Sequence, residues 1–349
     1  MCEYSSTDGH AGDWHLVHLG SRAIGGAGLV FTEATAVSPE ARISPHDLGI
    51  WKDEHIPALE RVTRFLHQHG AYAGIQLAHA GRKASMAPPW EKTRTIPPSE
   101  GGWQPIAPSS LRFNEAYPLP TALDRAGMDK IVADFRSAAL RAQAAGFDVI
   151  EVHAAHGYLL HEFLSPLSNQ RTDQYGGSFE NRVRFPLEVV RAVRAAWPEH
   201  LPVFVRISAT DWTPASLGES WALPESVAFA TLLKEAGVDL IDVSTGGNHP
   251  AQQIPLGPGY QVIHSATIHR EAGIPTGAVG MITAAAQADQ IIRNGEASLV
   301  LLAREFLRDP YWPLHAAQHL QQQITWPIQY LRAANTKPEP RQAVATPTV

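Results

Sequence analysis

The chain has 349 residues, of which 44% are hydrophobic and 18% are charged, and its formal net charge is −6. This length suits one large barrel or two ordinary domains, and the composition supports a large buried core and excludes a chain that is disordered as a whole. The acidic balance gives no reason to expect nucleic acid or an anionic membrane as a partner.

Cysteine usage and the N-terminal residues indicate a cellular compartment. Cys2 is the one cysteine, so the chain can form no internal disulfide and no four-cysteine iron–sulfur or zinc site. Such usage is typical of the reducing cytoplasm. The sequence has no apolar run of about 18 residues, as a membrane helix would need, and it begins without the features of a signal peptide. We expect a cytoplasmic protein.

Short apolar runs alternate with longer amphipathic stretches along the chain, which predicts strands followed by helices. The predicted strands are 28–37, 71–81, 147–157, 201–209, 238–247, 274–280 and 297–304. The predicted helices are 53–70, 128–146, 178–197, 223–237, 263–273, 283–295 and 305–320, the last broken at its prolines. Residues 85–123 are rich in Pro, Gly and Trp and predict a lid or binding loop.

This alternation predicts an α/β fold with a parallel sheet, and its even spacing favours a (β/α)8 TIM barrel over an open sheet. Most predicted helices end at a glycine that passes directly into an apolar strand, as in parallel α/β proteins. Neither a Rossmann glycine motif nor a P-loop is present, which argues against both of those nucleotide-binding folds. We expect a single catalytic domain over residues 1–332 and a mobile tail over 333–349.

The number of strands poses a problem for the barrel. Seven strands are predicted, whereas a closed TIM barrel has eight. No spare strand follows the last predicted helix. The expectation is therefore that the first barrel strand is missing from the N-terminus and would lie upstream of residue 1.

Catalytic groups of a βα barrel lie at the carboxyl ends of its strands. This sequence places there Glu33, Ala34, Gln76, His79, His153, His156, Tyr158, Arg206, the 244–247 turn, Gly280 and Arg304. Few of these are carboxylates, so the set is poorly suited to a metal-dependent hydrolase. Arginine, glutamine, histidine and tyrosine suit an anionic, planar ligand instead, and Arg304 follows the strand after which barrels commonly bind phosphate.

Several residues remain open to more than one interpretation. The segment "HAAHGYLLHEF" over 153–163 contains three histidines, and the pair His153 and His156 taken alone is more often structural than metal-binding. We assign His161 to packing. Trp90 and Trp103 would either contact a substrate or attach the 85–123 loop to the barrel.

The chain resembles the Old Yellow Enzymes, FMN-dependent ene-reductases, in their YqjM-like, xenobiotic-reductase branch. The resemblance is carried, in order, by "MCEYSS", "EATAVSPEARIS", "GIQLAHAGRKAS", "HAAHGYLLHEFLSPLSNQRTDQYGGSFENRVRF", "VRISATDW", "TGAVGMIT" and "AREFLRDPYW". It implies a TIM barrel whose first strand precedes the "MC" pair, and NADPH or NADH as the hydride donor.

The resemblance also implies how FMN is held. Gln76 and Arg206 would bind the pyrimidine edge of the flavin, and Cys2 and Ala34 would line its ring. The phosphate would be held by Gly280, Ala303 and Arg304. Ala303 stands where the family usually has glycine, so its Cβ would crowd the phosphate.

For the substrate, the resemblance implies an α,β-unsaturated carbonyl or nitro compound, whose C=C bond is reduced in a ping-pong reaction. His153 and His156 would bind the substrate oxygen, and Tyr158 would deliver a proton. Tyr4 and Lys83 would flank the pocket. Arg332 would enter the site of a neighbouring subunit, which implies a homo-oligomer, a dimer or tetramer.

Two alternatives to the ene-reductase stay open at this point. One is a truncated barrel fragment that binds no flavin and is catalytically silent. The other is a metal-dependent barrel hydrolase, which the scarcity of carboxylates at the strand ends disfavours.

Overall fold

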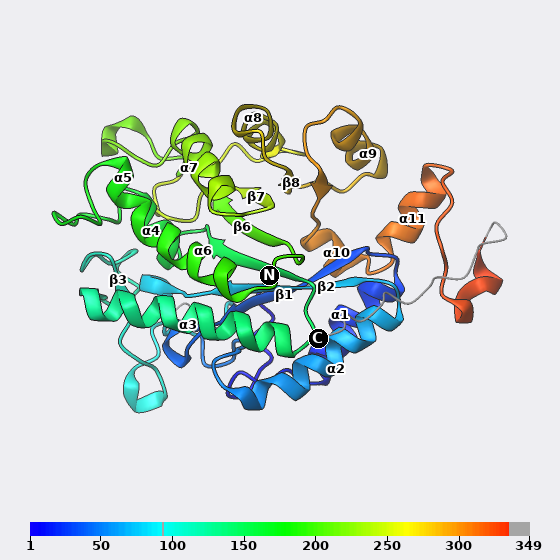
Figure 1. Cartoon of the computed structure of the whole chain (residues 1–349), viewed down its shortest axis with the longest axis horizontal. Helices are drawn as coiled ribbons and strands as arrows, with labels where there is room; N and C mark the ends of the chain where they lie inside the picture. Colours follow the sequence, from blue (N-terminus) through cyan, green and yellow to red (C-terminus); the bar gives the residue numbers. More distant parts are fainter. Residues whose placement is uncertain (93, 335–349) are drawn as a thin grey trace.

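Figure 1 shows the chain in a computed structural model that describes residues 1–92 and 94–334. The prediction of a mobile tail over 333–349 therefore falls almost wholly outside the described residues. A membrane-spanning helix, long and apolar enough to cross a bilayer, does not occur in the described part of the chain.

The described residues form one large parallel sheet in the order β1-β2-β5-β6-β7-β8-β9. Its strands are β1 (Leu29–Ala36), β2 (Tyr72–Ala78), β5 (Val149–Ala154), β6 (Val203–Ser208), β7 (Leu240–Ser244), β8 (Thr276–Ala278) and β9 (Leu299–Val300). These are the predicted strands, and each is shorter than predicted because the turn residues at its ends leave the ladder. Every neighbouring pair is parallel.

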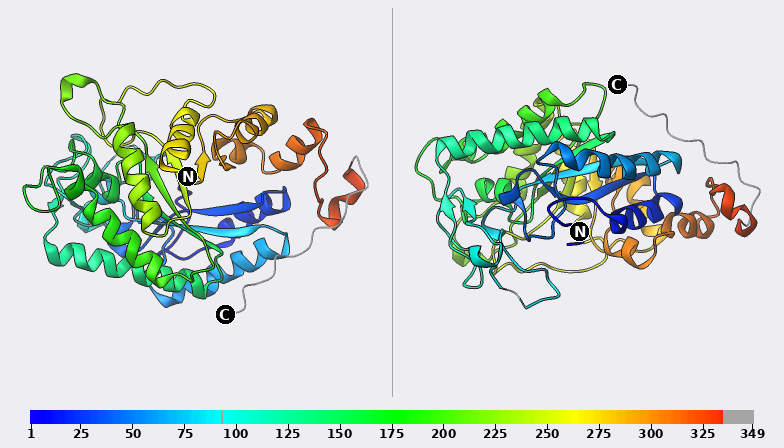
Figure 2. Two further views of the ribbon diagram at one scale, coloured as in Figure 1. Left: turned by 45° about the horizontal axis from the view of Figure 1, so that its top comes forward. Right: turned by 90° about the horizontal axis from the view of Figure 1, so that it is seen from below.

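Helices cover the outer face of the curled sheet (Figures 1 and 2). The long ones are α1 (Asp13–Ile24), α2 (Ile56–Gln68), α3 (Arg125–Ala144), α6 (Arg184–Ala196), α7 (Leu223–Glu235), α8 (Val262–Ala272), α9 (Ala285–Arg293) and α11 (Trp312–His319). The short ones are α4 (Leu159–Leu164), α5 (Phe179–Arg182) and α10 (Arg304–Arg308). The largest apolar cluster lies between helices and sheet. Strands that are buried on both faces explain the nearly continuous apolar runs in the sequence.

Alternate residues along each strand point toward the concave inner face of the sheet, and the inward side chains of neighbouring strands form layers. Close to the amino ends of the strands, Val149, Phe204 and Leu240 form a small apolar cluster, against which Leu29, Phe31 and Leu299 pack. The next inward positions toward the carboxyl ends are polar. The apolar layer therefore closes the bottom of the sheet, and polar chemistry is confined to the other end.

Three helical regions differ from the sequence-based expectation. Helix α1 was not predicted, although buried Leu19 and Ala23 lie one turn apart on it. The helix predicted over 178–197 is divided into α5 and α6 at Val183. The closing helix predicted over 305–320 is divided into α10 and α11, because Pro310 cannot continue a helical hydrogen-bond ladder, whereas Pro313 lies in the first turn of α11, where proline is tolerated.

The sheet is a curled half-barrel rather than the closed (β/α)8 barrel that was expected. Within the described residues, β9 pairs only with β8, and the outer edge of β1 forms only one isolated bridge, between Ala36 and Gly49. A cavity of about 660 Å³ extends between them, lined near the amino ends of the strands by residues such as Leu29, Val30 and Leu299. The closed eight-stranded barrel is therefore not part of the described structure.

The predicted lid over 85–123 is attached to the barrel by Trp103. Its indole nitrogen donates to the carbonyl oxygen of Glu40 at 2.8 Å, and the Arg42 guanidinium lies 4.7 Å from the Trp103 ring centre. The loop contains one short parallel pair, β3 (Ile106–Ala107) and β4 (Thr121–Ala122). Trp103 therefore anchors the loop, which was one of its two possible roles.

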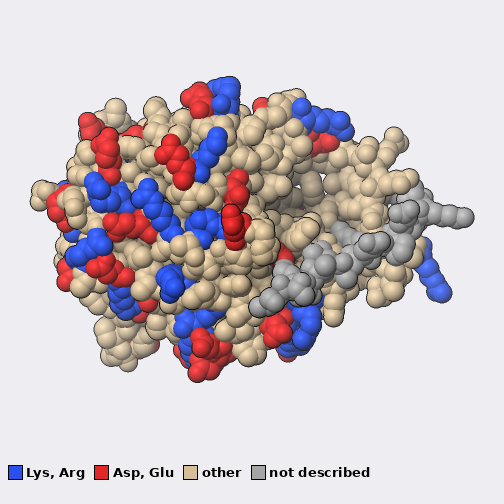
Figure 3. Space-filling view, in the orientation of Figure 1, with Lys and Arg blue, Asp and Glu red and all other residues tan. Residues whose placement is uncertain are grey.

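Charged side chains are distributed without a single-sign patch on the face seen in Figure 3. Acidic and basic residues intermingle over the body of the molecule, and the end formed by α9 to α11 carries few of them. This distribution offers no extended basic track on that face for a nucleic acid backbone.

Candidate active site

His153, His156 and Tyr158 converge at the carboxyl end of β5. The His153 ring centre lies 5.2 Å from that of His156 and 5.3 Å from that of Tyr158. His153 is the inward residue of the strand and is 3% exposed. His156 adopts a left-handed backbone conformation with φ 59°, which turns the chain sharply so that Tyr158 can begin α4. The predicted catalytic trio is thus brought together.

The His156 side chain is held from two neighbouring strands. The Ser208 hydroxyl of β6 accepts a hydrogen bond from the backbone N–H of His156 at 2.9 Å, and Nε2 of its ring pairs with the Ser244 hydroxyl of β7 at 2.7 Å. Nδ1 of His156 and both ring nitrogens of His153 have no hydrogen-bond partner in residues 1–92 and 94–334. Both imidazoles therefore retain a ring nitrogen for a ligand.

Burial decides the protonation states of the three side chains. Desolvation, and then the positive charge of Arg206, hold the pKa of His153 and of His156 well below the ordinary value. Desolvation holds the pKa of the Tyr158 phenol well above its ordinary value. At neutral pH the pair consists of neutral imidazoles, each of which can donate one N–H, beside a protonated phenol.

The turn that carries these residues is packed directly against the loop after β7. Gly157 has φ 70°, and a Cβ on it would overlap the carbonyl oxygen of Gly247. Gly247 in turn approaches the backbone of His156 so closely that it has no room for a side chain. His161, assigned to packing, accepts from the Gly157 N–H at 2.9 Å and faces Asp211 at 3.1 Å.

Substitution Gly157→Ala is expected to lower the free energy of unfolding by about 2–4 kcal/mol, because it combines backbone strain with overpacking. Gly177→Ala is the matched control, since Gly177 has φ 81° and no neighbouring atom within 4 Å of an added Cβ. The control should cost about 1 kcal/mol. Urea unfolding of both variants measures the difference, and equal losses would show that the contact with Gly247 is unimportant.

A polar layer lies below the histidines, on β2, β5, β6 and β7. Gln76 donates through Nε2 to the Glu151 carboxylate at 2.6 Å, and Nε of Arg206 lies 3.3 Å from Asp242. Burial and the charge of Asp242 raise the pKa of Glu151 to about 8, and burial raises that of Asp242. Arg206 opposes both shifts.

Glu151 and Asp242 were not singled out in the sequence, and neither was Ser208. The signal was available for Glu151, because it alternates with Val149 and His153 along β5 and therefore points to the same face. Asp242 has a similar place on β7. Their burial at 1% and 0% exposure depends on the curvature of the sheet, which the local pattern does not show.

The residues predicted for FMN fit an anionic, planar ligand with a phosphate. Gln76 and Arg206 line the cavity of about 660 Å³, together with Ala303, and such volumes are typical of small-molecule sites. The Arg206 guanidinium has no hydrogen-bond partner at its two terminal nitrogens in the described part of the chain, and its side chain is 20% exposed. It can therefore bind the electron-rich edge of a ring.

A phosphate would meet a second group of residues after β8 and β9. Gly280 has φ 125° and approaches Gln261 and Tyr260 so closely that a Cβ would crowd them. Ala303 precedes α10. Arg304 is exposed and forms no hydrogen bond or ion pair with any described residue. A free guanidinium beside this turn suits a phosphate group.

The N-terminal segment is tied to the end of β1 by Glu33. Its carboxylate accepts the backbone N–H of Glu3 at 2.5 Å and pairs with His15 at 3.1 Å. This holds half-buried Cys2 beside Ala34, where desolvation raises the pKa of the thiol. The predicted neighbours Cys2 and Ala34 are thus brought together.

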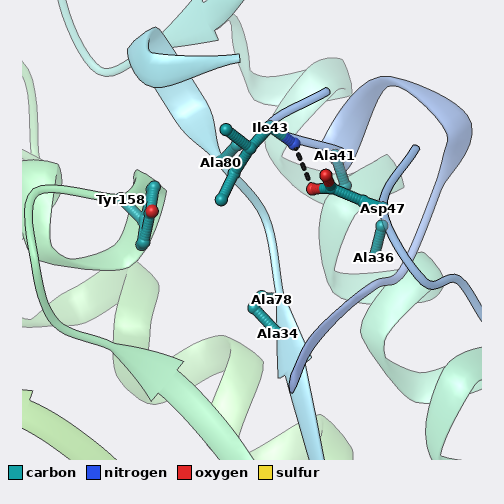
Figure 4. A pocket seen from close by; sticks show the side chains of 8 residues that line it. All are labelled: Ala34, Ala36, Ala41, Ile43, Asp47, Ala78, Ala80 and Tyr158. Carbon is teal, nitrogen blue, oxygen red and sulfur yellow. Dashed lines mark hydrogen bonds between the residues drawn. The ribbon is translucent and has the colours of Figure 1, made fainter. Parts of the chain in front are cut away.

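Figure 4 shows the small pocket between the ends of β1 and β2 and Tyr158. Its volume is about 10 Å³, and it is lined by Ala34, Ala36, Ala41, Ile43, Asp47, Ala78, Ala80 and Tyr158. Most of the side chains between the Tyr158 ring and the end of β1 are alanines, which keep the lining of this pocket small. Tyr4 lies in the same region, and its ring meets that of Trp90 edge-on at 5.6 Å.

The two remaining residues predicted for the substrate pocket are Lys83 and Arg332. Lys83 donates through its ammonium group to the carbonyl oxygens of His156, at 2.9 Å, and of Gly247. Arg332 is exposed in the 3-10 helix Ile328–Ala333, which both views place beyond α11 and away from β5 (Figures 1 and 2). Arg332 therefore does not reach the site of its own chain.

The site is not a metal centre of the kind that a hydrolase would need. The described residues contain no group of three or more His, Cys, Asp or Glu side chains placed to hold a metal ion. The site consists instead of neutral imidazoles, a phenol and guanidinium groups.

Comparison with known sequences gives a consistent result. A model of the NADH:flavin oxidoreductase / NADH oxidase family matches residues 1–323. The NADPH dehydrogenase of Geobacillus thermodenitrificans (strain NG80-2) is 51% identical over 334 residues, which are 95% of this chain and 92% of that protein. The NADPH dehydrogenase of Listeria innocua serovar 6a is 48% identical over 335 residues, with 95% and 93% covered.

Solved structures are also similar. Morphinone reductase has a TM-score of 0.75 and 29% identity, covering 94% of this chain and 86% of that one. Histamine dehydrogenase from Rhizobium sp. 4-9 has a TM-score of 0.76 and 30% identity, covering 91% of this chain and 45% of that one. The chain belongs to the NADH:flavin oxidoreductase / NADH oxidase family, the Old Yellow Enzymes, and is an FMN-dependent enzyme that uses NADPH or NADH.

Proposed function

We propose that the protein is an ene-reductase that reduces the C=C bond of α,β-unsaturated carbonyl or nitro compounds. The observation that carries the proposal is the pair of neutral imidazoles beside a protonated phenol at the end of β5. The bound FMN would accept hydride from NADPH or NADH and pass it to the substrate β-carbon. Binding of the substrate oxygen and delivery of the proton would be carried out by side chains of this chain.

The substrate oxygen would be bound by ring N–H groups of His153 and His156. Neutral imidazoles donate hydrogen bonds to an oxygen that gains negative charge, and they do so in a site that is largely closed to water. Tyr158 would protonate the α-carbon. Its raised pKa keeps the proton on the phenol until a more basic carbon anion forms beside it.

FMN would be held mainly by residues that line the cavity of about 660 Å³ or that form no hydrogen bond or ion pair with another described residue. Arg206 and Gln76 would bind the pyrimidine edge, with Cys2 and Ala34 beside the ring and Gly280, Ala303 and Arg304 at the phosphate. Asp242 supports this arrangement because it orients Arg206 from behind.

We further propose that the complete fold is the (β/α)8 barrel. The support is that, within the described residues, β9 leaves one edge unpaired and β1 pairs on its outer edge only at Ala36, and that part of the cavity of about 660 Å³ lies between these two strands. One additional parallel strand between these edges would pair both of them.

Assembly and location are also proposals. Arg332 is exposed on a segment that projects from the barrel, which suits a role in the site of a second copy. The enzyme would then be a homo-oligomer, and a dimer or tetramer would supply the neighbour. Its one cysteine fits the cytoplasm.

The alternatives are less well supported. The family match spans residues 1–323, and relatives align over 95% of this chain, so nothing in the comparisons favours a flavin-free, silent fragment. A hydrolase would need a metal site of a kind that residues 1–92 and 94–334 do not form.

The test is spectroscopic. The purified protein, supplied with FMN, should show flavin absorbance that bleaches with NADPH under anaerobic conditions and returns when 2-cyclohexenone is added. Return of the absorbance only after admission of oxygen would refute the ene-reductase proposal while leaving the family assignment intact.

A further inference from the structure

The Lys83 ammonium group links three segments that meet above the barrel. Lys83 ends the 3-10 helix Gly81–Lys83 after β2. Its Nζ donates to the His156 carbonyl oxygen at 2.9 Å and to the Gly247 carbonyl oxygen, which belong to the turns after β5 and β7. The Phe113 ring of the lid loop lies 4.2 Å from the same nitrogen.

These contacts enclose the ammonium group. An ammonium has three N–H donors and no acceptor. Two donors meet carbonyl oxygens, and the third side of the ammonium is covered by the face of Phe113 at a distance typical of a cation–π contact. The Tyr158 ring centre lies 5.5 Å from the same nitrogen, so two carbonyl oxygens and two aromatic rings of this chain surround the ammonium.

The carbonyl oxygen that Lys83 binds belongs to the strained residue of the site. His156 has φ 59°, a conformation that costs about 1–3 kcal/mol unless its surroundings enforce it. Ser208 binds its backbone N–H and Ser244 binds its ring. Lys83 binds the remaining backbone polar group of His156, its carbonyl oxygen. His156 is therefore restrained at its N–H, its ring and its carbonyl.

We propose that Lys83 is a positioning residue that acts on the substrate through His156 rather than by contact with the substrate. It joins the His156 carbonyl to the loop after β7 and so fixes the direction of the His156 imidazole. This role rests on the proposed function, in which His156 binds the substrate oxygen. Burial lowers the pKa of Lys83 to about 7, as expected for an amine that is enclosed by protein rather than by solvent.

The adjacent residue offers a matched control. Arg82 also reaches the loop after β7, where its guanidinium donates to the Asn248 carbonyl oxygen at 2.6 Å. It makes no contact with the His156 carbonyl. Substitution of Arg82 should loosen the same loop without freeing His156, which separates a general effect on the loop from an effect on the imidazole.

The experiment is a double-mutant cycle on the FMN-loaded enzyme, with ligand affinity as its readout. 4-Hydroxybenzaldehyde is the probe, because its phenolate oxygen imitates an enolate oxygen, and its binding is followed by the change in flavin absorbance. Lys83→Met should weaken binding by about 10- to 100-fold, the effect of losing one charged hydrogen bond. Arg82→Met should lower thermal stability and leave the affinity within about threefold of the parent.

The cycle is completed by His156→Ala. In that background Lys83→Met should change the affinity by less than about twofold, since the residue through which Lys83 acts is gone. A loss of similar size in both backgrounds would overturn the proposal and indicate direct contact with the ligand. Lys83→Gln serves if Lys83→Met does not retain FMN, because its amide still donates one hydrogen bond.

The experiment distinguishes a wrong role for Lys83 from a wrong proposed function. If the parent enzyme binds no phenol, then the oxygen-binding role of the histidines is wrong. If the parent binds it and Lys83→Met binds it equally well, only the role of Lys83 is wrong.

Discussion

Substitution Tyr158→Phe is expected to slow the transfer of reducing equivalents to 2-cyclohexenone by about 10²- to 10³-fold, as is usual for the loss of a general acid. The phenol is removed while the ring and its edge-on contact with His153 remain. Oxidation of NADPH in the first half-reaction needs no proton from this side chain and should keep its rate. Stopped-flow measurement of the two half-reactions separates the effects.

A control substrate and a control variant sharpen this test. A nitroalkene yields an anion whose charge is spread over the nitro oxygens and which needs no immediate proton, so its reduction should be far less impaired. Tyr175→Phe removes a hydroxyl that donates to Glu188 at 3.0 Å on the outside of the barrel, and it should leave both half-reactions unchanged. A Tyr158→Phe enzyme that reduces 2-cyclohexenone at the parent rate would show that the proton comes from elsewhere.

Substitution Arg206→Met is expected to abolish retention of FMN and to lower the free energy of unfolding by about 3–5 kcal/mol. The guanidinium is the side-chain cation that lowers the pKa of both Glu151 and Asp242. Asp242 is 0% exposed, and without Arg206 its charge would be buried with no partner at that side. FMN content after purification and urea unfolding measure the two effects.

The loss of stability in Arg206→Met is expected to depend on pH in one direction. Removing Arg206 raises the folded-state pKa of Glu151 and Asp242 further above the unfolded value, so the folded state binds more protons. Stability is then lost as pH rises, and the deficit of Arg206→Met should be larger at pH 8 than at pH 5. An equal deficit at both values would argue against the buried carboxylates as its cause.

Asp242→Asn provides the companion variant. Combined with Arg206→Met, it removes the unpaired charge, so part of the lost stability should return while FMN stays absent. Full recovery of FMN binding in the double variant would contradict a direct role of Arg206 at the flavin.

The strands could be predicted because their residues both favour extended backbone and supply the apolar side chains that the buried sheet needs. Strand β5 is buried along its whole length, and apart from Glu151 and His153 its residues are apolar, so the strand can be recognised from the sequence alone. Helix α1 escaped notice because its buried face is short and contains His15 and Gly20. The helix predicted over 178–197 is interrupted at Val183, which the helical pattern of the segment does not reveal.

Site residues could be predicted from the sequence where a polar residue follows the end of a predicted strand. They were harder to predict where the role of a residue depends on contacts with segments far away in the chain. His153, His156 and Tyr158 lie within six residues of one another, so their proximity follows from the chain itself. Lys83 lies 73 residues from His156. Its expected place beside the substrate is still a prediction, and the observed contacts instead join it to two backbone carbonyls.

The sequence by itself determined the parallel α/β architecture and placed His153, His156 and Tyr158 together at the carboxyl end of one strand, because burial periodicity and strand-end position are properties of short segments. The tertiary structure alone decided the protonation states of these groups, the pairing of Arg206 with Asp242 and the restraint of the His156 turn. Those features depend on desolvation and on contacts between segments far apart in the chain, and curvature of the sheet brings the segments together.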